Sequence, residues 1–440
     1  MTIKNKLTIG ILLLSLLPGL VLAKEVRQFT LENGMLVVVM PDYKTSGVTH
    51  SVWYKVGGAD DEPGKSGTAH FLEHLMFKGT KKFKAGMFHH IIGSNGGSYN
   101  AFTHFDFTAY YEKIMPEHLE KAMELEADRM RNLILDEREI ELERKVVLEE
   151  RRMRTDNVPK EQLEEHMRST IYQYHPYGRP VIGWEKEILN IKKEDLQRFY
   201  NKYYQPSNAI LVISGSIDPE EVLTLAQKYY GGIENTQEIK RDTIGQIEIV
   251  GKLNLKMNSN FDTRRWVRYY KAPSAAYSGL SKSISFLVAT YILGEGKSSR
   301  LYRSLVIEKK LATDVAIEYD PGAYKENTIF GIHIAPTAEA ELEKISQECD
   351  SVMQEFISRG ISKEELEKAK NMILADIVYS QESFYQKAEQ YGVALTVGIS
   401  LEDIESWHQE KLQAVIKEEV VDAITNIIGS SFDGYLLSQK

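Results

Sequence analysis

The side chains best suited to chemistry in this sequence are two histidines, His70 and His74, in the segment His-Phe-Leu-Glu-His. Because four positions separate them, a helix would project both imidazoles from one face. Two neutral imidazoles at this spacing can bind one zinc ion at about 2.0–2.1 Å. Glu73 lies at the edge of the same face, where its carboxylate could take a proton from a water activated by zinc. The segment therefore predicts a metal site that supports hydrolysis.

The helix that would carry this motif is predicted over about residues 66–77. The Ser-Gly-Thr run at 66–68 is a typical helix start, and the Lys-Gly pair at 78–79 is a typical end. Apolar residues surround the two histidines, so the helix is expected to be buried whether or not it binds metal. The competing interpretation is a chance His-x-x-Glu-His in a core helix.

A zinc hydrolase needs a third protein ligand and an open fourth position. The charged segment 136–154, predicted to be helical, offers acids in two neighbouring stripes along its surface. A carboxylate among aliphatic side chains is costly to bury unless it is paired or binds metal. Periodicity does not choose between Glu149 and Glu150, and a solvated charged helix is the simpler interpretation for most of these acids. The stripes are Ile140, Glu143, Val147 and Glu150, and Leu142, Val146, Glu149 and Met153.

The composition excludes several classes of protein. The chain has 440 residues, of which 42% are hydrophobic and 27% charged, as in soluble globular proteins of more than one domain. A net charge of −9 argues against a nucleic-acid partner held by bulk charge. The single cysteine, Cys349, excludes internal disulfides, a thiolate zinc site and an iron–sulfur cluster.

The first 23 residues are typical of a secretory signal peptide. Lys4 and Lys6 precede an apolar run over 7–23, which ends in the small-residue pattern Val-Leu-Ala. The alternative is an uncleaved membrane anchor. The apolar run has 17 residues, which is just enough to span a membrane. We expect export to a periplasmic or extracellular location, with membrane tethering if the signal is uncut. No other membrane association is expected.

The remaining chain is expected to form two α+β domains, 24–230 and 251–440, joined by a linker at 231–250. The linker begins with two glycines and has little apolar content. Each half mixes mainly antiparallel strands with long helices, and the first includes a β-rich run at 98–114. The similar order of elements indicates a duplication that produced two structurally similar halves.

The inverted order of the His-x-x-Glu-His motif is typical of inverzincin metalloproteases. The chain resembles the pitrilysin/insulinase family, which includes the mitochondrial processing peptidases, over nearly all of its length after the signal segment. The resemblance implies that His70 and His74 bind one zinc ion per chain and that Glu73 is the general base. Bacterial members of about this length are the most similar.

The resemblance also implies the remaining ligand and its support. The third ligand in the family lies seven residues after the Glu of a Glu-Arg pair, which here is Glu143-Arg144. That position is Glu150 and not Glu149. Glu143 would then orient one of the ligand histidines.

A substrate-binding strand is the next implied feature. Asn100-Ala101, followed by the aromatic run 106–111, resembles a family strand that binds an extended peptide along the edge of a sheet. The alternative is an ordinary aromatic strand packed inside the sheet.

The second half departs from the motif, because Ser285, Val288 and Ala289 stand at the positions of the zinc residues. It is expected to hold no zinc and to form a wall of a clamshell-shaped chamber. Family members that act alone carry a substrate-contacting Arg and Tyr, and the matching residues here are Val306 and Thr313. We therefore expect a homologous subunit that supplies this pair, or a homodimer.

Together these features predict an exported zinc metalloendopeptidase that cleaves peptides or unfolded protein segments inside a closed chamber. The alternative is a non-hydrolytic peptide-binding or assembly subunit of a heterodimer. The complete set of zinc residues argues against that alternative, since such subunits tend to lose them. Neither nucleic acid nor, beyond the signal segment, membrane is an expected partner.

Overall fold

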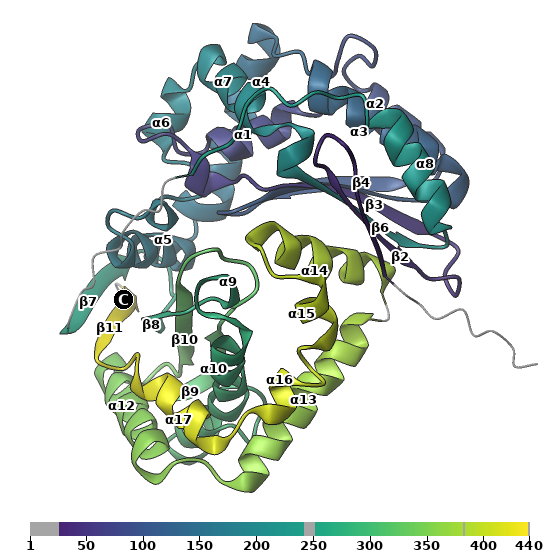
Figure 1. Cartoon of the computed structure of the whole chain (residues 1–440). Coiled ribbons are helices and arrows are strands. Elements are labelled where there is room, and N and C mark those ends of the chain that lie inside the picture. Colours follow the sequence, from purple (N-terminus) through teal and green to yellow (C-terminus); the bar gives the residue numbers. More distant parts are fainter. Residues whose placement is uncertain (1–25, 242–250, 382, 439–440) are drawn as a thin grey trace, which may run out of the picture.

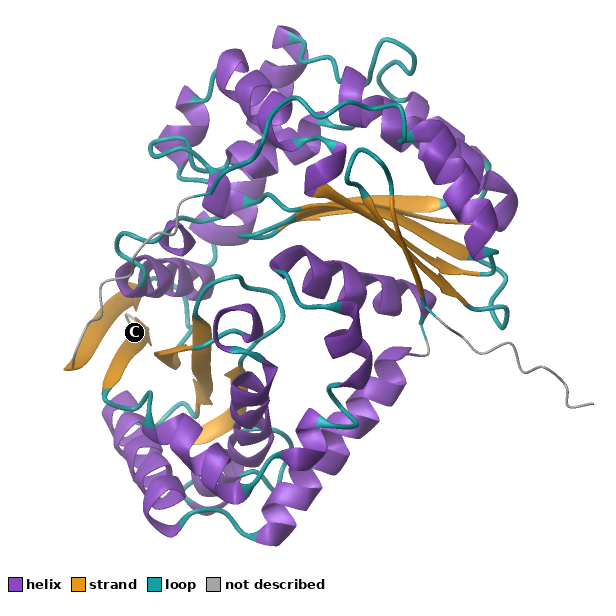
Figure 2. Cartoon of the chain, viewed as in Figure 1, coloured by secondary structure: helices purple, strands orange, loops and turns teal. Residues whose placement is uncertain are grey.

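The computed structural model describes residues 26–241, 251–381 and 383–438. The predicted signal peptide and the second part of the predicted linker lie outside the described residues. The chain forms two halves, each a sheet flanked by helices (Figures 1 and 2). The predicted α+β class with two similar halves is confirmed. None of the described helices combines the length and apolar character needed to cross a membrane.

The first half contains a six-stranded sheet whose outer edge, β4, pairs with only one neighbour. Strands β2 and β6 run parallel, and the other pairs are antiparallel. Both β2 and β6 read as nearly continuous apolar runs because both faces of the sheet are covered. In spatial order the strands are β1 (Arg27–Thr30), β2 (Leu36–Pro41), β6 (Ala209–Gly215), β3 (Val48–Tyr54), β5 (Thr108–Ile114) and β4 (Ser98–Thr103).

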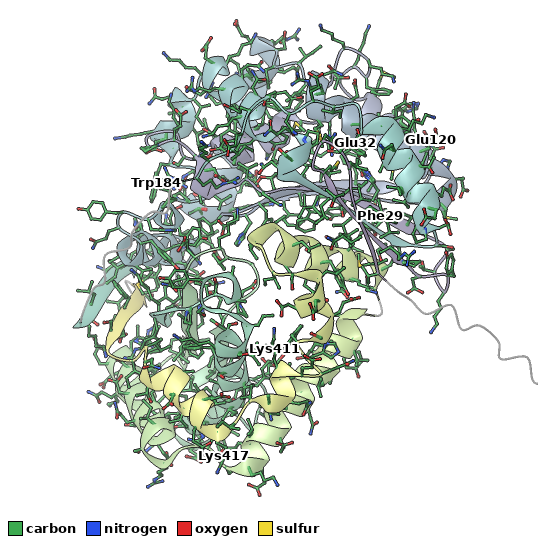
Figure 3. All side chains as sticks on the ribbon, in the orientation of Figure 1. Phe29, Glu32, Glu120, Trp184, Lys411 and Lys417 are labelled. Carbon is green, nitrogen blue, oxygen red and sulfur yellow. The ribbon has the colours of Figure 1, made fainter. Side chains whose placement is uncertain are left out.

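The helices of the first half other than α5 cover one face of this sheet and enclose its main core. Two of them, α3 and α8, lie side by side, and Glu120 of α3 forms a 2.6 Å ion pair with Lys228 of α8 (Figure 3). The helices are α1 (Thr68–Leu75), α2 (Met87–Ser94), α3 (Leu119–Asn132), α4 (Glu137–Arg151), α5 (Pro159–Ile171), α6 (Glu185–Asn190), α7 (Lys193–Tyr203) and α8 (Pro219–Tyr229).

The second half repeats this topology without the first strand. Its two parallel strands, β7 and β11, correspond to β2 and β6, and its free edge β9 corresponds to β4. In both halves the last strand of the half lies between the first two long strands: β6 lies between β2 and β3, and β11 lies between β7 and β8. This shared and unusual order supports the predicted duplication. The spatial order is β7 (Gly251–Ser259), β11 (Ser430–Ser438), β8 (Arg265–Ala272), β10 (Thr328–Pro336) and β9 (Ala312–Glu318).

Most helices of the second half cover one face of the second sheet and form a second core. The long helices α10 and α12 pack directly on its strands. The helices are α9 (Ala275–Ser278), α10 (Leu280–Leu293), α11 (Arg300–Tyr302), α12 (Leu342–Arg359), α13 (Lys363–Gln381), α14 (Phe384–Val397), α15 (Leu401–Ser406), α16 (Lys411–Ala414) and α17 (Lys417–Thr425).

The two halves exchange one helix each. Helix α5 of the first half packs on β7, β8 and β11 of the second sheet, and α14 of the second half packs on β3 and β6 of the first. Where α14 packs on β3, a Cβ on Gly392 would lie 2.0 Å from the ring of Trp53. A third hydrophobic core therefore contains residues of both halves, and each half covers one face of the other's sheet with a helix.

Candidate metal centre

Helix α1 is fixed at its start by Asp61 and Gly67. The Asp61 carboxylate accepts hydrogen bonds from the backbone N–H groups of Gly67 (2.8 Å) and Ala69 (2.9 Å). Burial raises the pKa of Asp61 to about 8, and these hydrogen bonds oppose the shift. Gly67 has a φ of 89°, and a Cβ there would lie 2.6 Å from the carbonyl oxygen of Ile182. Only glycine fits this close approach, so the position and direction of α1 are set before its first turn.

His70 and His74 on α1 face Glu150 near the end of α4. The Nε2 atoms of His74 and His70 lie 3.2 Å and 3.6 Å from Oε2 of Glu150. One ligand atom from each residue can be chosen so that all three lie within 4.8 Å of one another. Ligand atoms about 2.0–2.1 Å from a tetrahedral zinc are about 3.4 Å apart, so these separations suit zinc. Within the described ranges no other group of three or more such side chains has this arrangement.

The two candidate glutamates on α4 have different surroundings. The side chain of Glu149 is 55% exposed and pairs with Arg152, whereas that of Glu150 is 17% exposed and faces the histidines. The structure thus brings Glu150 and not Glu149 to the cluster. Arg154, one turn further along, contacts the other oxygen of Glu150, Oε1, at 2.8 Å. Sequence analysis missed Arg154, although its i,i+4 spacing from Glu150 was a signal.

The two imidazoles have different electrostatic environments. Burial lowers the pKa of His70 to about 4, so this ring is neutral and able to bind metal at physiological pH. Burial also lowers the pKa of His74, but hydrogen bonds to Glu143 and Glu150 outweigh it and raise that pKa to about 9. Because zinc binds the neutral ring, its binding would compete with the proton on His74.

Glu143 lies behind His74, two turns before Glu150 on α4. His74 Nδ1 donates a 3.0 Å hydrogen bond to Oε1 of Glu143, and Lys78 Nζ lies 2.5 Å from Oε2. Burial raises the pKa of Glu143, but these two contacts outweigh it and hold that pKa below its ordinary value. An ionised Glu143 fixes the tautomer of His74 that presents Nε2 to Glu150.

Glu73 lies beside the cluster and is only 9% exposed. Burial raises its pKa above the ordinary value of a glutamate, and the hydrogen bond from Thr103 opposes this shift. Thr103 Oγ1 donates to Oε2 of Glu73 at 2.5 Å. Sequence analysis did not select Thr103, although it ends the strand that begins near Asn100.

The predicted substrate strand is β4, the edge of the first sheet. Asn100 and Ala101 pair with Tyr111 and Tyr110 of β5, and the opposite side of β4 has no strand partner among the described residues. Asn100 is exposed and Ala101 is buried. Because α1 packs against β4, the open edge runs beside the candidate metal centre.

The positions that replace the motif in the second half lie on α10, where Ser285, Val288 and Ala289 are buried. Thr313 lies on β9, the second sheet's counterpart of β4, and Val306 lies in the π-helical segment Arg303–Glu308. These side chains offer no imidazole or carboxylate, so the second half has no counterpart of the cluster on α10.

The comparisons with known proteins fit this geometry. Residues 36–185 match the family model described as Insulinase (Peptidase family M16), and residues 190–373 match the model described as Peptidase M16 inactive domain. The zinc protease PqqE of Helicobacter pylori is 35% identical over 358 residues, which cover 80% of each chain. An uncharacterized zinc protease of Rickettsia bellii is 27% identical over 404 residues, or 91% of this chain and 94% of the relative.

Solved structures show the same fold. A protease from Helicobacter pylori superposes with a TM-score of 0.87 at 31% identity and covers 94% of this chain and 99% of its own. Pitrilysin superposes with a TM-score of 0.81 at 18% identity, with 94% of this chain covering 45% of that protein. The present chain thus corresponds to about half of the pitrilysin chain.

Proposed function

The chain belongs to the insulinase-type M16 peptidase family, and on that premise we propose that it is a zinc-dependent metalloendopeptidase that cleaves peptides or unfolded protein segments. The observation that carries the proposal is the convergence of His70, His74 and Glu150, with Glu73 beside them. The segment that matches the inactive-domain model begins at residue 190, after all four of these residues.

The three side chains suit zinc by chemistry as well as by spacing. Two imidazole nitrogens and one carboxylate oxygen form a ligand set that zinc hydrolases use, and it leaves a position open. Zinc held there would act as a Lewis acid toward the substrate carbonyl and the attacking water.

The remaining steps fall to side chains of this chain. Glu73 would take a proton from the water whose oxygen bonds to the peptide carbonyl carbon, and would deliver it to the amide nitrogen as the C–N bond breaks. Glu143 would hold His74 in its ligand tautomer. The open edge of β4, with Asn100 and Ala101, would pair with the backbone of an extended substrate. This mode of binding selects extended or unfolded chains.

The chamber needs a second wall. Because the chain covers 45% of pitrilysin, we propose that this wall comes from another subunit. That subunit would be either a homologous chain with the Arg and Tyr expected at the positions of Val306 and Thr313, or a second copy of this chain, which lacks that pair. The signal-like segment at 1–23 further supports export as a proposal.

The decisive experiment is cleavage of mixed unstructured peptides by the purified chain, with zinc content measured in the same sample. We expect cleavage that a chelator abolishes and zinc restores. Glu73→Gln should keep zinc and lower the rate at least about 100-fold. Unchanged turnover in Glu73→Gln would contradict the catalytic assignment. Zinc bound without cleavage would favour either the non-hydrolytic alternative or a missing subunit. Adding the homologous subunit would distinguish the two, because only a missing subunit would restore cleavage.

A further inference from the structure

Thr103 is held more firmly than a residue at the end of an edge strand usually is. It closes the β4–β5 ladder opposite Thr108, and the next residue, His104, donates a 2.8 Å backbone hydrogen bond to the carbonyl of Phe107. His104 is itself packed parallel to the Phe107 ring, with centroids 4.8 Å apart. The backbone of Thr103 is thus fixed from both sides, and so is the place of its hydroxyl.

That hydroxyl reaches across from the sheet to helix α1. Its 2.5 Å hydrogen bond to Oε2 of Glu73 joins two elements that are 30 residues apart in sequence. Within the described part of the chain, no other side chain donates a hydrogen bond to Glu73. A glutamate carboxylate otherwise rotates broadly about its last torsion, so this bond decides which way its plane faces.

We propose that Thr103 is a positioning residue for the reaction: its hydroxyl binds one oxygen of Glu73 and thereby orients the other, Oε1, to accept the proton of the attacking water. This inference rests on the proposed peptidase function. A base must lie within hydrogen-bond reach of the proton it removes, and small misplacements of reacting groups cost about 100-fold in rate.

The same bond connects the base to the substrate strand. A peptide paired with the open edge of β4 lies along the strand that Thr103 ends, and Thr103 contacts the base. The register of the peptide and the orientation of Glu73 are therefore set by one rigid element. This arrangement is expected to affect turnover of bound peptide more than its affinity, because β4 itself is unchanged when the hydroxyl is removed.

The test compares Thr103→Val and Thr103→Ser with the wild type, as full-length protein with measured zinc content, on one unstructured peptide. Thr108→Val is the matched control. Thr108 is the ladder partner of Thr103, but it lies on the inner strand β5 and not on the open edge of β4, and its buried hydroxyl donates to the carbonyl of Val56 at 2.9 Å. We expect kcat of Thr103→Val to fall at least about 10-fold with KM and zinc content within about twofold of wild type. Thr103→Ser should keep most of kcat, and Thr108→Val should lose thermal stability without losing kcat.

Several outcomes would overturn the inference. These are a normal kcat in Thr103→Val, a loss that Thr103→Ser does not rescue, or a fall in zinc content that accounts for the lost rate. If Thr103→Val does not fold, Thr103→Ala removes the same hydroxyl with less crowding and carries the same comparison. Normal turnover in the Thr103 variants would refute this inference alone, whereas a zinc-loaded wild type that cleaves no peptide would refute the proposed function and this inference with it.

Discussion

Glu143 shows how far the candidate metal centre depends on residues behind the three proposed ligands. Its carboxylate contacts His74 Nδ1 and Lys78, and it lies on the same helix as Glu150. One helix therefore supplies both a ligand and the group that orients a ligand on α1. A shift of α4 would disturb both functions at once.

Replacing Glu143 by glutamine should weaken zinc binding by about 10- to 100-fold, because the amide cannot accept the His74 hydrogen bond as a carboxylate does. Competition with a chromophoric chelator measures this affinity directly. Glu149→Gln is the matched control, since Glu149 is on the same helix but faces solvent. Equal zinc affinity in the two variants would show that Glu143 does not support the ligand.

The residues of the site differ in how well the sequence alone could identify them. The spacing of His70, Glu73 and His74 depends only on helix geometry, so one short segment was enough to propose them. Glu149 and Glu150 could not be separated by periodicity, because both lie next to apolar stripes and only the packing of α4 on α1 distinguishes them. Thr103 was missed because its contact with Glu73 depends on how a strand and a helix pack.

At the level of elements, α14 is the least expected feature of the fold. Nothing local in its sequence indicates that it crosses to the other half's sheet. Similarly, the predicted β-rich run at 98–114 forms two strands, β4 and β5, paired as a hairpin. Local alternation predicts that strands exist, whereas partners far apart in sequence decide which face each element covers.

The contact between α14 and β3 makes Gly392→Ala a sharp probe. A Cβ at this position would meet the ring of Trp53, which is 2% exposed and donates a hydrogen bond to Ser51, so the ring has no room to move. We expect a loss of about 1–3 kcal/mol in the free energy of unfolding, even though alanine favours helices. Urea unfolding monitored by Trp fluorescence measures the change.

A second glycine provides the control for this substitution. Gly93 lies within α2, and a Cβ there would contact nothing within 4 Å. Gly93→Ala should leave stability unchanged or raise it by up to about 1 kcal/mol. A Gly392→Ala variant as stable as Gly93→Ala would mean that α14 does not pack tightly on the first sheet.

At the scale of the whole molecule, a buried histidine connects the two halves. His333 on β10 lies with Nε2 3.1 Å from Glu318 of β9 and Nδ1 3.5 Å from Glu164 of α5, the exchanged helix. Arg168 and Arg265 face the same two carboxylates at 3.8 Å and 3.9 Å. The contact between the halves thus contains a small group of interlinked charges.

The stability of this contact should depend on pH. Burial lowers the pKa of His333, but its contacts with the carboxylates of Glu164 and Glu318 outweigh burial and raise that pKa above its ordinary value. A group with a raised pKa stabilises the fold fully below its unfolded value, about 6.5, and this contribution is lost as pH rises through the folded value. The melting temperature Tm of the wild type should exceed that of His333→Gln below about pH 6.5, and this difference should shrink as the pH rises above that value. A constant or growing advantage would contradict the assignment.

The exchange of α5 and α14 has a consequence for the history of this chain. Each helix follows the long charged helix of its half, and each covers the sheet of the other half. Two identical ancestral chains making the same contacts would form a two-fold symmetric dimer in which each partner lends one helix to the other. Joining the genes of such partners end to end would preserve the interface and free one copy from selection to keep the motif. The absence of the motif from α10 fits such a history, because the second half keeps the exchanged helix without the motif residues.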